Sequence, residues 1–340
     1  MAKPLPKDDL AHVLQHARED LEQLRGARLF VTGGTGFFGK WLVETFLHAN
    51  RELRLGAAMT VLTRDAVRFE ADCPHLASDP SLSFHPGDVR TFEFPAARFT
   101  HIIHGAVASS NEPLESFVTS VEGTRRVLDL ATRSDAKRLL FLSSGAVYGP
   151  QPPGMTHVPE TYLGAPDTLQ TSSGYGEAKR AAEYLCCASS PDHKLESVIA
   201  RCFAFVGPHL PLNANFAIGN FMADVLAGRP ISVLGDGTTY RSYLHAADLS
   251  IWLWALLVRG ANGRAYNVGS DEGITIAALA KLVAEAAGGK SEVRIARTPV
   301  PGVAPPRYVP SIERARAELG LGVRIKLREG IQRTIAWLRQ

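Results

Sequence analysis

The sequence predicts an α/β protein built on a doubly wound parallel sheet. Short apolar runs typical of buried strands alternate with segments of helical spacing, and a glycine-rich turn joins the first run to the helix that follows it. No internal repeat interrupts this order. Because strands that alternate with helices form βαβ units, the sheet should be parallel with right-handed crossovers. A chain of 340 residues can bury a large core, as one big unit or as two joined lobes.

The predicted strands are short and apolar. An amphipathic helix over residues 8–25 precedes them, and packing or an oligomer contact explains this helix better than catalysis does. Longer helical patterns cover residues 117–131 and 175–187. The strands are expected over residues 27–32, 58–62, 101–104, 138–143 and 195–201.

The charge balance and the cysteines exclude several classes of function. A net charge of +3, from 37 basic and 34 acidic residues, provides no long-range field for nucleic acid or an anionic membrane. The N-terminus has no apolar signal segment, and no stretch stays apolar over the roughly eighteen residues that a membrane span requires. The cysteines form no CxxC pair and no cluster with zinc spacing. We therefore expect a cytoplasmic protein with reduced thiols, no bound metal, and neither a nucleic-acid nor a membrane partner.

The first strand ends in a turn that contains Gly33, Gly36 and Gly39 at intervals of three. Such a turn lets the chain reverse tightly and lets a pyrophosphate approach bare backbone, while the start of the next helix offers amide groups to the phosphates. A glycine triplet alone is weak evidence. Its position inside the first βαβ unit predicts a Rossmann-like dinucleotide-binding fold.

Past Arg201 the pattern loosens into segments punctuated by proline and glycine. We expect a helical extension over residues 1–26 and a Rossmann domain that binds NAD(P) over residues 27–200. Residues 201–340 should form mainly a smaller C-terminal substrate-binding lobe, with some segments crossing back to the first domain.

The end of the second strand bears on the choice of cofactor. Folds of this kind that prefer NAD usually place an acidic residue there, but this chain has Thr63 followed by Arg64. A guanidinium can pair with the 2′-phosphate of NADP, so Arg64 favours NADP over NAD. The alternative is that Arg64 is merely solvated and Asp65 binds the ribose. Asp88 and Val89, after an expected third strand, are placed to approach the adenine, although a surface turn explains Asp88 nearly as well.

Tyr175 and Lys179 form the most informative pair. Residues four apart on a helix share a face, so a phenol and an ammonium can point into one cleft. Free tyrosine has a pKa of about 10, and bringing it near 7 takes roughly 4 kcal/mol of differential stabilisation. Positive charge from Lys179 and from an oxidised nicotinamide would contribute to that stabilisation, and Tyr175 could then act as a general base.

A strand that ends in hydroxyl groups supports this interpretation. Residues 139–142 lead into Ser143 and Ser144, at the carboxyl edge of the sheet where open α/β proteins bind ligands. Ser144 is placed to hydrogen-bond a reacting oxygen. The competing explanation is ordinary turn chemistry.

Taken together, these motifs resemble the extended short-chain dehydrogenase/reductase family of nucleotide-sugar epimerase/dehydratase type. The resemblance extends from about residue 27 to the C-terminus. It rests on residues 32–39, 102–104 and 143–149, on Tyr175 with Lys179, on residues 201–208, and on residues 235–237 with Arg241 and Asp248.

The resemblance implies an NAD(P)-dependent enzyme that acts on a nucleotide-diphosphate sugar, with Ser144, Tyr175 and Lys179 as catalytic residues. It implies that Arg241 reaches the substrate diphosphate, for which a salt bridge to Asp248 is the structural alternative, and that Asn220 and Arg307 approach the nucleotide. Tyr175 and Lys179 would also contact the cofactor, together with Gly33, Gly36, Phe37, Phe38, Gly39, Thr63, Arg64, Asp88, Val89 and His104.

Departures from the family pattern bear on the reaction. Similar 4,6-dehydratases usually carry Asp-Glu directly after the catalytic hydroxyl residue, and decarboxylating relatives tend to keep a glutamate there, but this chain has Gly145 and Ala146. Neither can transfer a proton. This favours oxidation or reduction at the sugar C4, by an epimerase or a 4-ketoreductase. Ala204 and Val206 replace the Asn and Tyr of many relatives, which leaves the sugar and base open.

Two further alternatives remain at this stage. One is a dehydratase with atypical acid residues, and the other is a non-catalytic protein that senses NADP or serves as a scaffold. A sensor would have little reason to retain Ser144, Tyr175 and Lys179 together. The resemblance also allows a homodimer through helices at residues 117–131 and 175–187.

Overall fold

The structure of the protein is a computed structural model that describes residues 2–107, 112–189, 195–213, 216–289 and 291–340. The chain divides into two compact units. The first contains residues 1–149, 165–202 and 250–266, and the second contains residues 150–164, 203–249 and 267–340.

A seven-stranded sheet of order β11-β6-β5-β4-β1-β2-β3 confirms the predicted doubly wound α/β fold. Strand β1 lies between β4 and β2 and pairs with both in parallel. The chain runs outward from β1 in both directions, which brings the carboxyl ends of β1 and β4 together. The strands are β1 (Arg28–Thr32), β2 (Ala58–Thr63), β3 (Leu82–Pro86), β4 (His101–His104), β5 (Arg138–Ser144), β6 (Glu196–Cys202) and β11 (Arg264–Val268).

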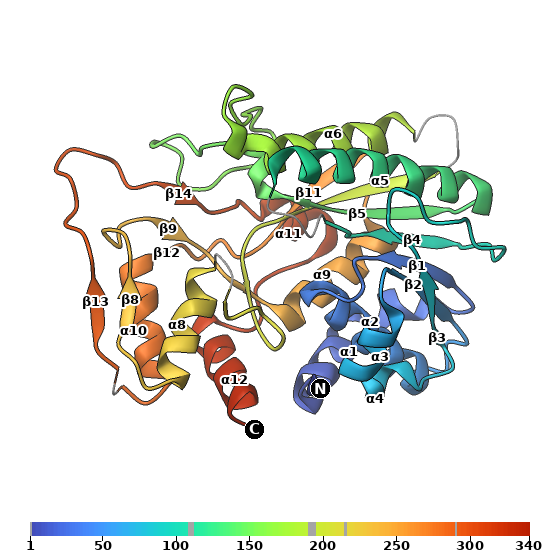
Figure 1. The fold of residues 1–340 in the computed structure, drawn as a ribbon, viewed down its shortest axis with the longest axis horizontal. Coiled ribbons are helices and arrows are strands. Elements are labelled where there is room, and N and C mark those ends of the chain that lie inside the picture. The colour runs from blue at the N-terminus through green and yellow to red at the C-terminus, as the bar shows by residue number, and fades with distance from the viewer. Residues whose placement is uncertain (1, 108–111, 190–194, 214–215, 290) are drawn as a thin grey trace. The chain divides into compact units, whose positions relative to one another are not determined.

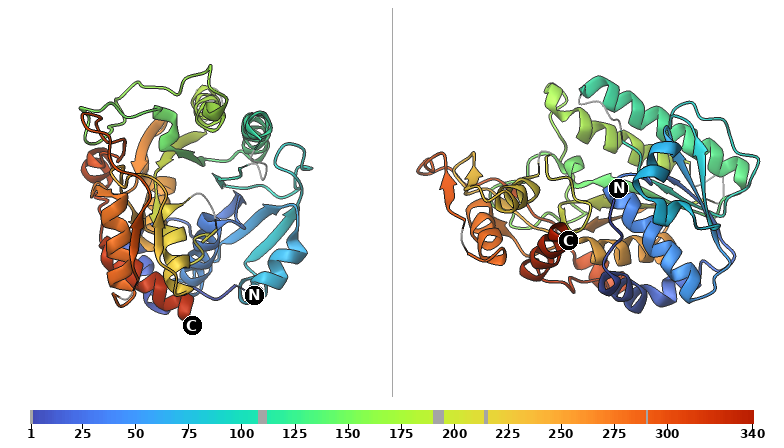
Figure 2. Two further views of the ribbon diagram at one scale, coloured as in Figure 1. Left: turned by 60° about the vertical axis from the view of Figure 1, so that its left-hand side comes forward. Right: turned by 60° about the horizontal axis from the view of Figure 1, so that its bottom comes forward.

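Helices cover both faces of this sheet (Figure 1). Helices α5 (Pro113–Ser134) and α6 (Gly174–Ala188) pack side by side on one face, as the left view of Figure 2 shows almost end-on. Helices α1 (Lys7–Glu22) and α2 (Phe37–Glu52) pack together on the other face. The shorter elements of the first unit are α3 (Ala66–Asp72), α4 (Pro74–Ala77), η1 (Gly145–Tyr148) and η2 (Thr171–Ser173).

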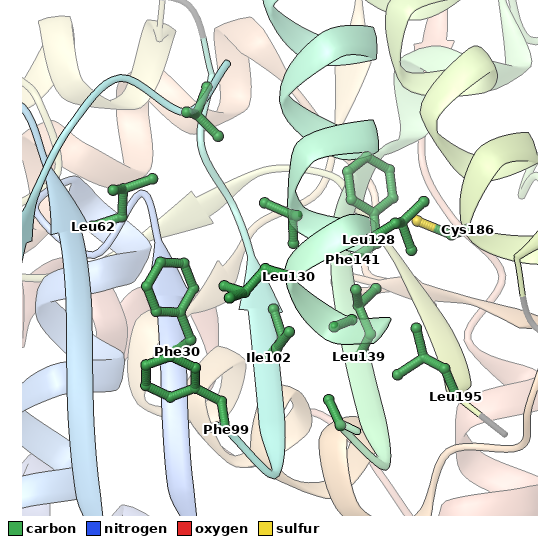
Figure 3. Packing of buried hydrophobic residues seen from close by; sticks show 14 of the residues in the cluster. Phe30, Leu62, Phe99, Ile102, Leu128, Leu130, Leu139, Phe141, Cys186 and Leu195 are labelled. Atoms are coloured by element: carbon green, nitrogen blue, oxygen red, sulfur yellow. The ribbon is translucent and has the colours of Figure 1, made fainter. Parts of the chain in front are cut away.

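Apolar side chains fill the space between the sheet and helices α5 and α6 (Figure 3). Phe30, Ile102 and Leu139 come from three neighbouring strands and are at most 1% exposed. Leu128 from α5 and Cys186 from α6 close the cluster from the helical side. Burial of this apolar surface anchors α6, and with it the predicted catalytic residues, to the carboxyl ends of the strands.

The second unit holds three small sheets, of orders β10-β7, β13-β8 and β12-β9-β14. Its strands are β7 (Phe205–Val206), β8 (Ile231–Val233), β9 (Tyr240–Arg241), β10 (Leu244–His245), β12 (Ile274–Thr275), β13 (Val293–Ile295) and β14 (Arg307–Tyr308). Its helices are α8 (Ala217–Leu226), α10 (Ile276–Ala286), α11 (Glu313–Leu319) and α12 (Leu327–Arg339), and the boundary between the units falls within α9 (Ala246–Arg259) and β11.

Helix α9 shows where the sequence pattern is least informative. Among the ten residues from Leu249 to Val258 every side chain but one is apolar. Trp252 and Trp254 in this run are 1% and 0% exposed. A helix that is buried on every side has no polar stripe, so the periodicity that identifies surface helices is missing. For this reason the sequence pattern did not predict helix α9 and indicated only a loop-rich lobe in this part of the chain.

Candidate active site

The glycine turn after β1 is tightly constrained by its surroundings. Gly33 has φ +75°, and a Cβ added there would lie 2.5 Å from the carbonyl oxygen of Gly105. A Cβ on Gly39 would lie 2.2 Å from the backbone of Gly34. Only glycine fits at these two positions.

Gly36 differs from the other two glycines. Its nearest neighbour to an added Cβ is the Gly33 oxygen at 3.5 Å, so the protein leaves open space there. Gly36 also caps α2, a sixteen-residue helix, without a side-chain hydrogen bond, so no side chain at the cap position covers the N-terminus of this helix. A bare glycine turn followed by the N-terminus of a long helix is the arrangement that a pyrophosphate requires, so these residues fit a dinucleotide. Phe37 and Phe38 are the first residues of α2.

His104 is buried next to this turn and is not exposed at its surface. It is 2% exposed, and its two ring nitrogens lie 2.7 Å from the Thr32 hydroxyl and 3.0 Å from the Thr124 hydroxyl. Burial, with a smaller contribution from Lys179, lowers the pKa of His104 to about 3, so the ring is neutral at pH 7. Thr32 in turn accepts hydrogen bonds from the backbone of Gly105 and Ala106. The His104 side chain therefore holds Thr32, the residue before the turn, in place. Both of its ring nitrogens have protein partners, so neither is available to a cofactor.

The end of β2 presents Arg64 to solvent, while Thr63 is 8% exposed. Asp65 caps α3 by accepting a hydrogen bond from the Arg68 backbone at 2.9 Å, so one of its carboxylate oxygens has a structural partner. This weakens the alternative in which Asp65 binds the ribose.

Asp88 and Val89 follow β3, as the sequence predicted. Burial opposes ionisation of Asp88, but hydrogen bonds from Arg90 and the nearby charge of Arg64 outweigh it and lower the pKa of Asp88. The Asp88 carboxylate accepts from Arg90 Nε at 3.0 Å. Val89 is 9% exposed and packs into the core cluster.

Ser144, Tyr175 and Lys179 come together at the carboxyl end of β5. Ser144 is the last residue of β5, and its hydroxyl oxygen accepts from the Ala146 backbone at 3.1 Å. Tyr175 and Lys179 lie one turn apart on α6, with the Lys179 ammonium 6.0 Å from the centre of the Tyr175 ring. Lys179 is 2% exposed and donates to the Leu142 carbonyl at 2.9 Å.

The electrostatics of this pair differ from the sequence-based argument. Desolvation raises the pKa of Tyr175, and a side-chain hydrogen bond with Ser144 only partly offsets this increase. Burial lowers the pKa of Lys179 to about 8. The ammonium is directed at the strand carbonyl rather than at the phenol. The protein alone therefore does not lower the pKa of Tyr175.

Apart from Ser144, the expected substrate residues belong to the second unit. Arg241 in β9 lies 5.5 Å above the Tyr308 ring, and Arg307 in β14 lies 3.9 Å above the Tyr240 ring. Because successive strand residues point to opposite faces, the two arginines lie on opposite faces of this small sheet. Asn220 is exposed on α8. The Asp248 carboxylate accepts from the backbone of residues 324 and 325, which explains its burial without a salt bridge to Arg241.

Three residues beside the site were not predicted. A Cβ on Gly34 would lie 2.7 Å from Val61, and one on Gly105 would lie 2.7 Å from Leu142. The only sign in the sequence that these two glycines belong to the site was their position next to the predicted motifs. Cys202 faces Ser144 in the β5–β6 register, and burial raises the pKa of its thiol to about 12. No sequence motif indicates such a neighbour, because register depends on the sheet.

Within the described residues, no group of three or more His, Cys, Asp or Glu side chains could hold a metal ion. The same part of the chain contains no helix that is both long and apolar enough to cross a membrane.

Residues 29–269 match the family model described as the NAD dependent epimerase/dehydratase family. The chain belongs to this family. The match includes the glycine turn, Ser144, Tyr175 and Lys179, and it confirms the resemblance drawn from the motifs.

Similar members of the NAD-dependent epimerase/dehydratase family have several activities. UDP-glucuronic acid decarboxylase 1 of Arabidopsis thaliana is 30% identical over 314 residues, which cover 91% of this chain and 69% of that protein. The UDP-glucose 4-epimerase of Thermus thermophilus, solved with NAD, has a TM-score of 0.74 and 26% identity over 92% of this chain and 99% of that one. A dTDP-glucose 4,6-dehydratase of Streptomyces venezuelae, also solved with NAD, has a TM-score of 0.75 and 25% identity over 92% and 97%. The protein is thus an NAD-dependent enzyme of the nucleotide-sugar-modifying type.

Proposed function

We propose that this enzyme oxidises or reduces C4 of a sugar linked to a nucleoside diphosphate, as an epimerase or a 4-ketoreductase. The observation that supports this proposal is a complete Ser144, Tyr175 and Lys179 set followed by Gly145 and Ala146, which carry no acid. Transfer of a hydride at one carbon and of a proton at the oxygen bonded to it needs only these three side chains and the cofactor. Elimination of water or carbon dioxide needs a further proton-transferring group.

Each side chain has a distinct task in this proposal. The Ser144 oxygen already accepts from the Ala146 N–H, so its own hydrogen can be donated to the reacting sugar oxygen. Tyr175 exchanges the hydroxyl proton with the sugar as general base or acid. Lys179 adds positive charge near Tyr175, and its hydrogen bond to the Leu142 carbonyl fixes the position of the ammonium. A nicotinamide cofactor held at the glycine turn would supply the hydride acceptor and donor.

Residues of the second unit are proposed to recognise the nucleotide. Arg241 would bind the diphosphate, since a guanidinium forms paired hydrogen bonds with phosphate oxygens. Asn220 and Arg307 would contact the nucleoside. A pairing of two copies through α5 and α6 is also proposed, because Leu114 and Tyr184 on these helices are 67% and 72% exposed.

Chromatographic separation of the products followed by mass analysis tests the reaction. The purified enzyme is incubated with UDP- and dTDP-linked hexoses and their 4-keto forms, together with NAD, NADH, NADP or NADPH. An epimerase yields an isomer of unchanged mass without net cofactor consumption, and a ketoreductase adds two hydrogens while oxidising one cofactor. Tyr175→Phe should slow either reaction by about 10²–10⁴-fold. Wild-type enzyme and Tyr175→Phe that are equally inactive with every substrate would refute the proposal.

The identity to plant UDP-glucuronic acid decarboxylases favours decarboxylation as the second candidate. Ala146 counts against it, because this position offers no proton donor or acceptor. UDP-glucuronic acid is therefore included in the substrate panel. Release of carbon dioxide from it would establish decarboxylation in place of simple C4 redox chemistry.

A further inference from the structure

A buried carboxylate on α6 connects the elements that carry the proposed catalytic residues. Glu183 lies one turn after Lys179 and two turns after Tyr175, and it is 8% exposed. The Ser143 hydroxyl donates to Glu183 Oε1 at 2.5 Å. Arg201 donates to both carboxylate oxygens, from Nε at 3.0 Å to Oε1 and from Nη2 at 2.7 Å to Oε2. Paired contacts of this kind fix direction as well as distance.

The register of the sheet explains why one carboxylate reaches both partners. Ser143 on β5 stands opposite Arg201 on β6, and the next pair in the register is Ser144 with Cys202. Residues opposite each other in a sheet point to the same face. Glu183 therefore joins α6 to two strand ends at the position immediately before Ser144. The Arg201 guanidinium also lies 4.8 Å above the ring of Tyr148 in η1, which extends the connection to the loop after Ser144.

Several ionisable groups surround Lys179 in this cluster. The groups that face Lys179 are Tyr175, Glu183 and Cys186 on its own helix, Cys202 on β6 and His104 on β4. Burial raises the pKa of both thiols and lowers that of His104, so these three groups are neutral at pH 7.

Glu183 is thus the negative charge among these neighbours of Lys179. The groups around Glu183 itself are Arg201, Lys179 and the thiols of Cys186 and Cys187, whose pKa values are also raised by burial. Arg201, which is partly buried, pairs with Glu183 directly, and the buried Lys179 lies one turn before Glu183 on α6, so two cations neighbour the same carboxylate.

We propose that Glu183 is a positioning residue of this site, which holds Tyr175 and Lys179 in place against Ser144 through Ser143 and Arg201 and keeps the Lys179 ammonium protonated. It acts on the reaction through these residues without touching substrate. The proposal rests on the catalytic roles proposed for Tyr175 and Lys179.

The charge of Glu183 is tested with Glu183→Gln, which keeps the shape of the side chain. Loss of the anion leaves Lys179 and the partly buried Arg201 without this counter-charge, so the Lys179 pKa should fall by about one unit. The full-length protein, saturated with NAD and carrying isotope-labelled lysine, is titrated by NMR, and Lys179→Met identifies the signal. The alkaline limb of the kcat/KM profile should move down with this pKa.

Two comparisons separate this role from a purely structural one. Glu183→Gln combined with Arg201→Gln restores the charge balance and should return the Lys179 pKa toward the wild-type value. Glu122→Gln, an exposed change on α5, should leave it unmoved. A Glu183→Gln protein that loses thermal stability without any shift of the Lys179 pKa or of the pH profile would overturn the proposed electrostatic role.

The geometric role is tested with Ser143→Ala, which removes one hydrogen bond but no charge. We expect kcat to fall about tenfold, the equivalent of roughly 1.4 kcal/mol, with KM and the NAD dissociation constant unchanged. Ser143→Thr restores the hydroxyl and should recover kcat. The control is Ser197→Ala, because Ser197 is fully buried on β6 and its hydroxyl has no hydrogen-bond partner among the described residues. Equal kcat values for Ser143→Ala and wild type would overturn the geometric role.

The NMR titration needs no turnover, so failure of this inference and failure of the proposed function can be told apart. A shifted Lys179 pKa in an enzyme that converts no nucleotide sugar would uphold the charge effect of Glu183 and overturn the proposed function. An unshifted Lys179 pKa in an enzyme that converts a nucleotide sugar would overturn the charge effect of Glu183 and uphold the proposed function.

Discussion

Lys179 is the residue at which stability and function conflict most directly. Its ammonium is 2% exposed, and burial lowers its pKa from 10.5 to about 8. At pH 7 the group is charged in both the folded and the unfolded chain, so the folded state bears a desolvation cost of up to about 3 kcal/mol. Such a cost persists where the charge is needed for function.

Replacing Lys179 with Met should therefore stabilise the protein while it abolishes turnover. The Leu142 carbonyl loses its partner, which reduces the expected gain to about 1–2 kcal/mol at pH 7. Between pH 8 and 10.5 the unfolded wild-type chain binds more protons than the folded one, so wild-type stability rises and the advantage of Lys179→Met shrinks. Urea unfolding at several pH values measures this. A destabilised Lys179→Met protein at pH 7 would contradict the desolvation argument.

Arg64 tests the preference for NADP. Because it is exposed at the end of β2, next to Thr63 and without an acidic residue at that position, it should interact with a 2′-phosphate. Arg64→Ala should weaken NADP binding about tenfold or more, with little change for NAD, as loss of one charged hydrogen-bonding partner implies. Calorimetric dissociation constants for both cofactors measure this, and Arg68→Ala on the exposed start of α3 serves as the control. An unchanged ratio of the two constants would exclude this role.

His104 on strand β4 links neighbouring elements by hydrogen bonds, and this arrangement requires its ring to be neutral. Its ring joins Thr32 on β1 to Thr124 on α5, and these bonds hold the strand beside the glycine turn. Protonation would place a cation in a buried site close to Lys179.

Acid should therefore destabilise the protein through His104. Its pKa is about 3 in the folded chain, below the ordinary 6.5, so the unfolded chain binds more protons between these values. Stability is lost as pH falls below about 6.5, at up to about 1.4 kcal/mol per pH unit. His104→Gln should flatten this dependence, as unfolding experiments from pH 7 to pH 5 can show. A wild-type slope that persists in His104→Gln would assign the acid sensitivity to other groups.

Helix α6 illustrates how one element serves both packing and chemistry. Its buried face carries Ala182 and Cys186 into the core, while Tyr175 remains 41% exposed near its start. The sequence predicted the helix and the shared face of Tyr175 and Lys179, because both follow from the 3.6-residue period. It did not reveal the role of Glu183, whose partners Ser143 and Arg201 come from two different strands.

For the protein as a whole, cofactor binding should be visible as stability. A ligand that binds only the folded chain at one hundred times its dissociation constant adds about 2.7 kcal/mol. Thermal unfolding should therefore shift upward with NAD or NADP and not with AMP at the same concentration, if the pyrophosphate contributes to binding at the glycine turn. Gly36→Val, which fills the open space there, should remove the shift. An unaltered shift in Gly36→Val would place the dinucleotide elsewhere.

The long-range order of the sheet was predictable because βαβ units leave few topologies open. Five strands, the first helix and both α5 and α6 were expected from periodicity, although α1 ends at Glu22 and α5 begins earlier, at Pro113. Strand β11 and helix α9 were not expected. A short edge strand and a helix buried on all sides both lack the alternation of polar and apolar residues on which such predictions depend.

Local sequence was sufficient to identify the glycine turn, the strand end at Ser144 and the tyrosine–lysine pair, since each is defined by residues close together in the chain. Their electrostatic state required the folded structure. The raised pKa of Tyr175, the neutral His104 and the contacts of Glu183 depend on side chains many positions apart, which strand register and packing bring together. Spacing along a chain specifies which face a residue occupies, but the energy of a charge depends on everything that surrounds it.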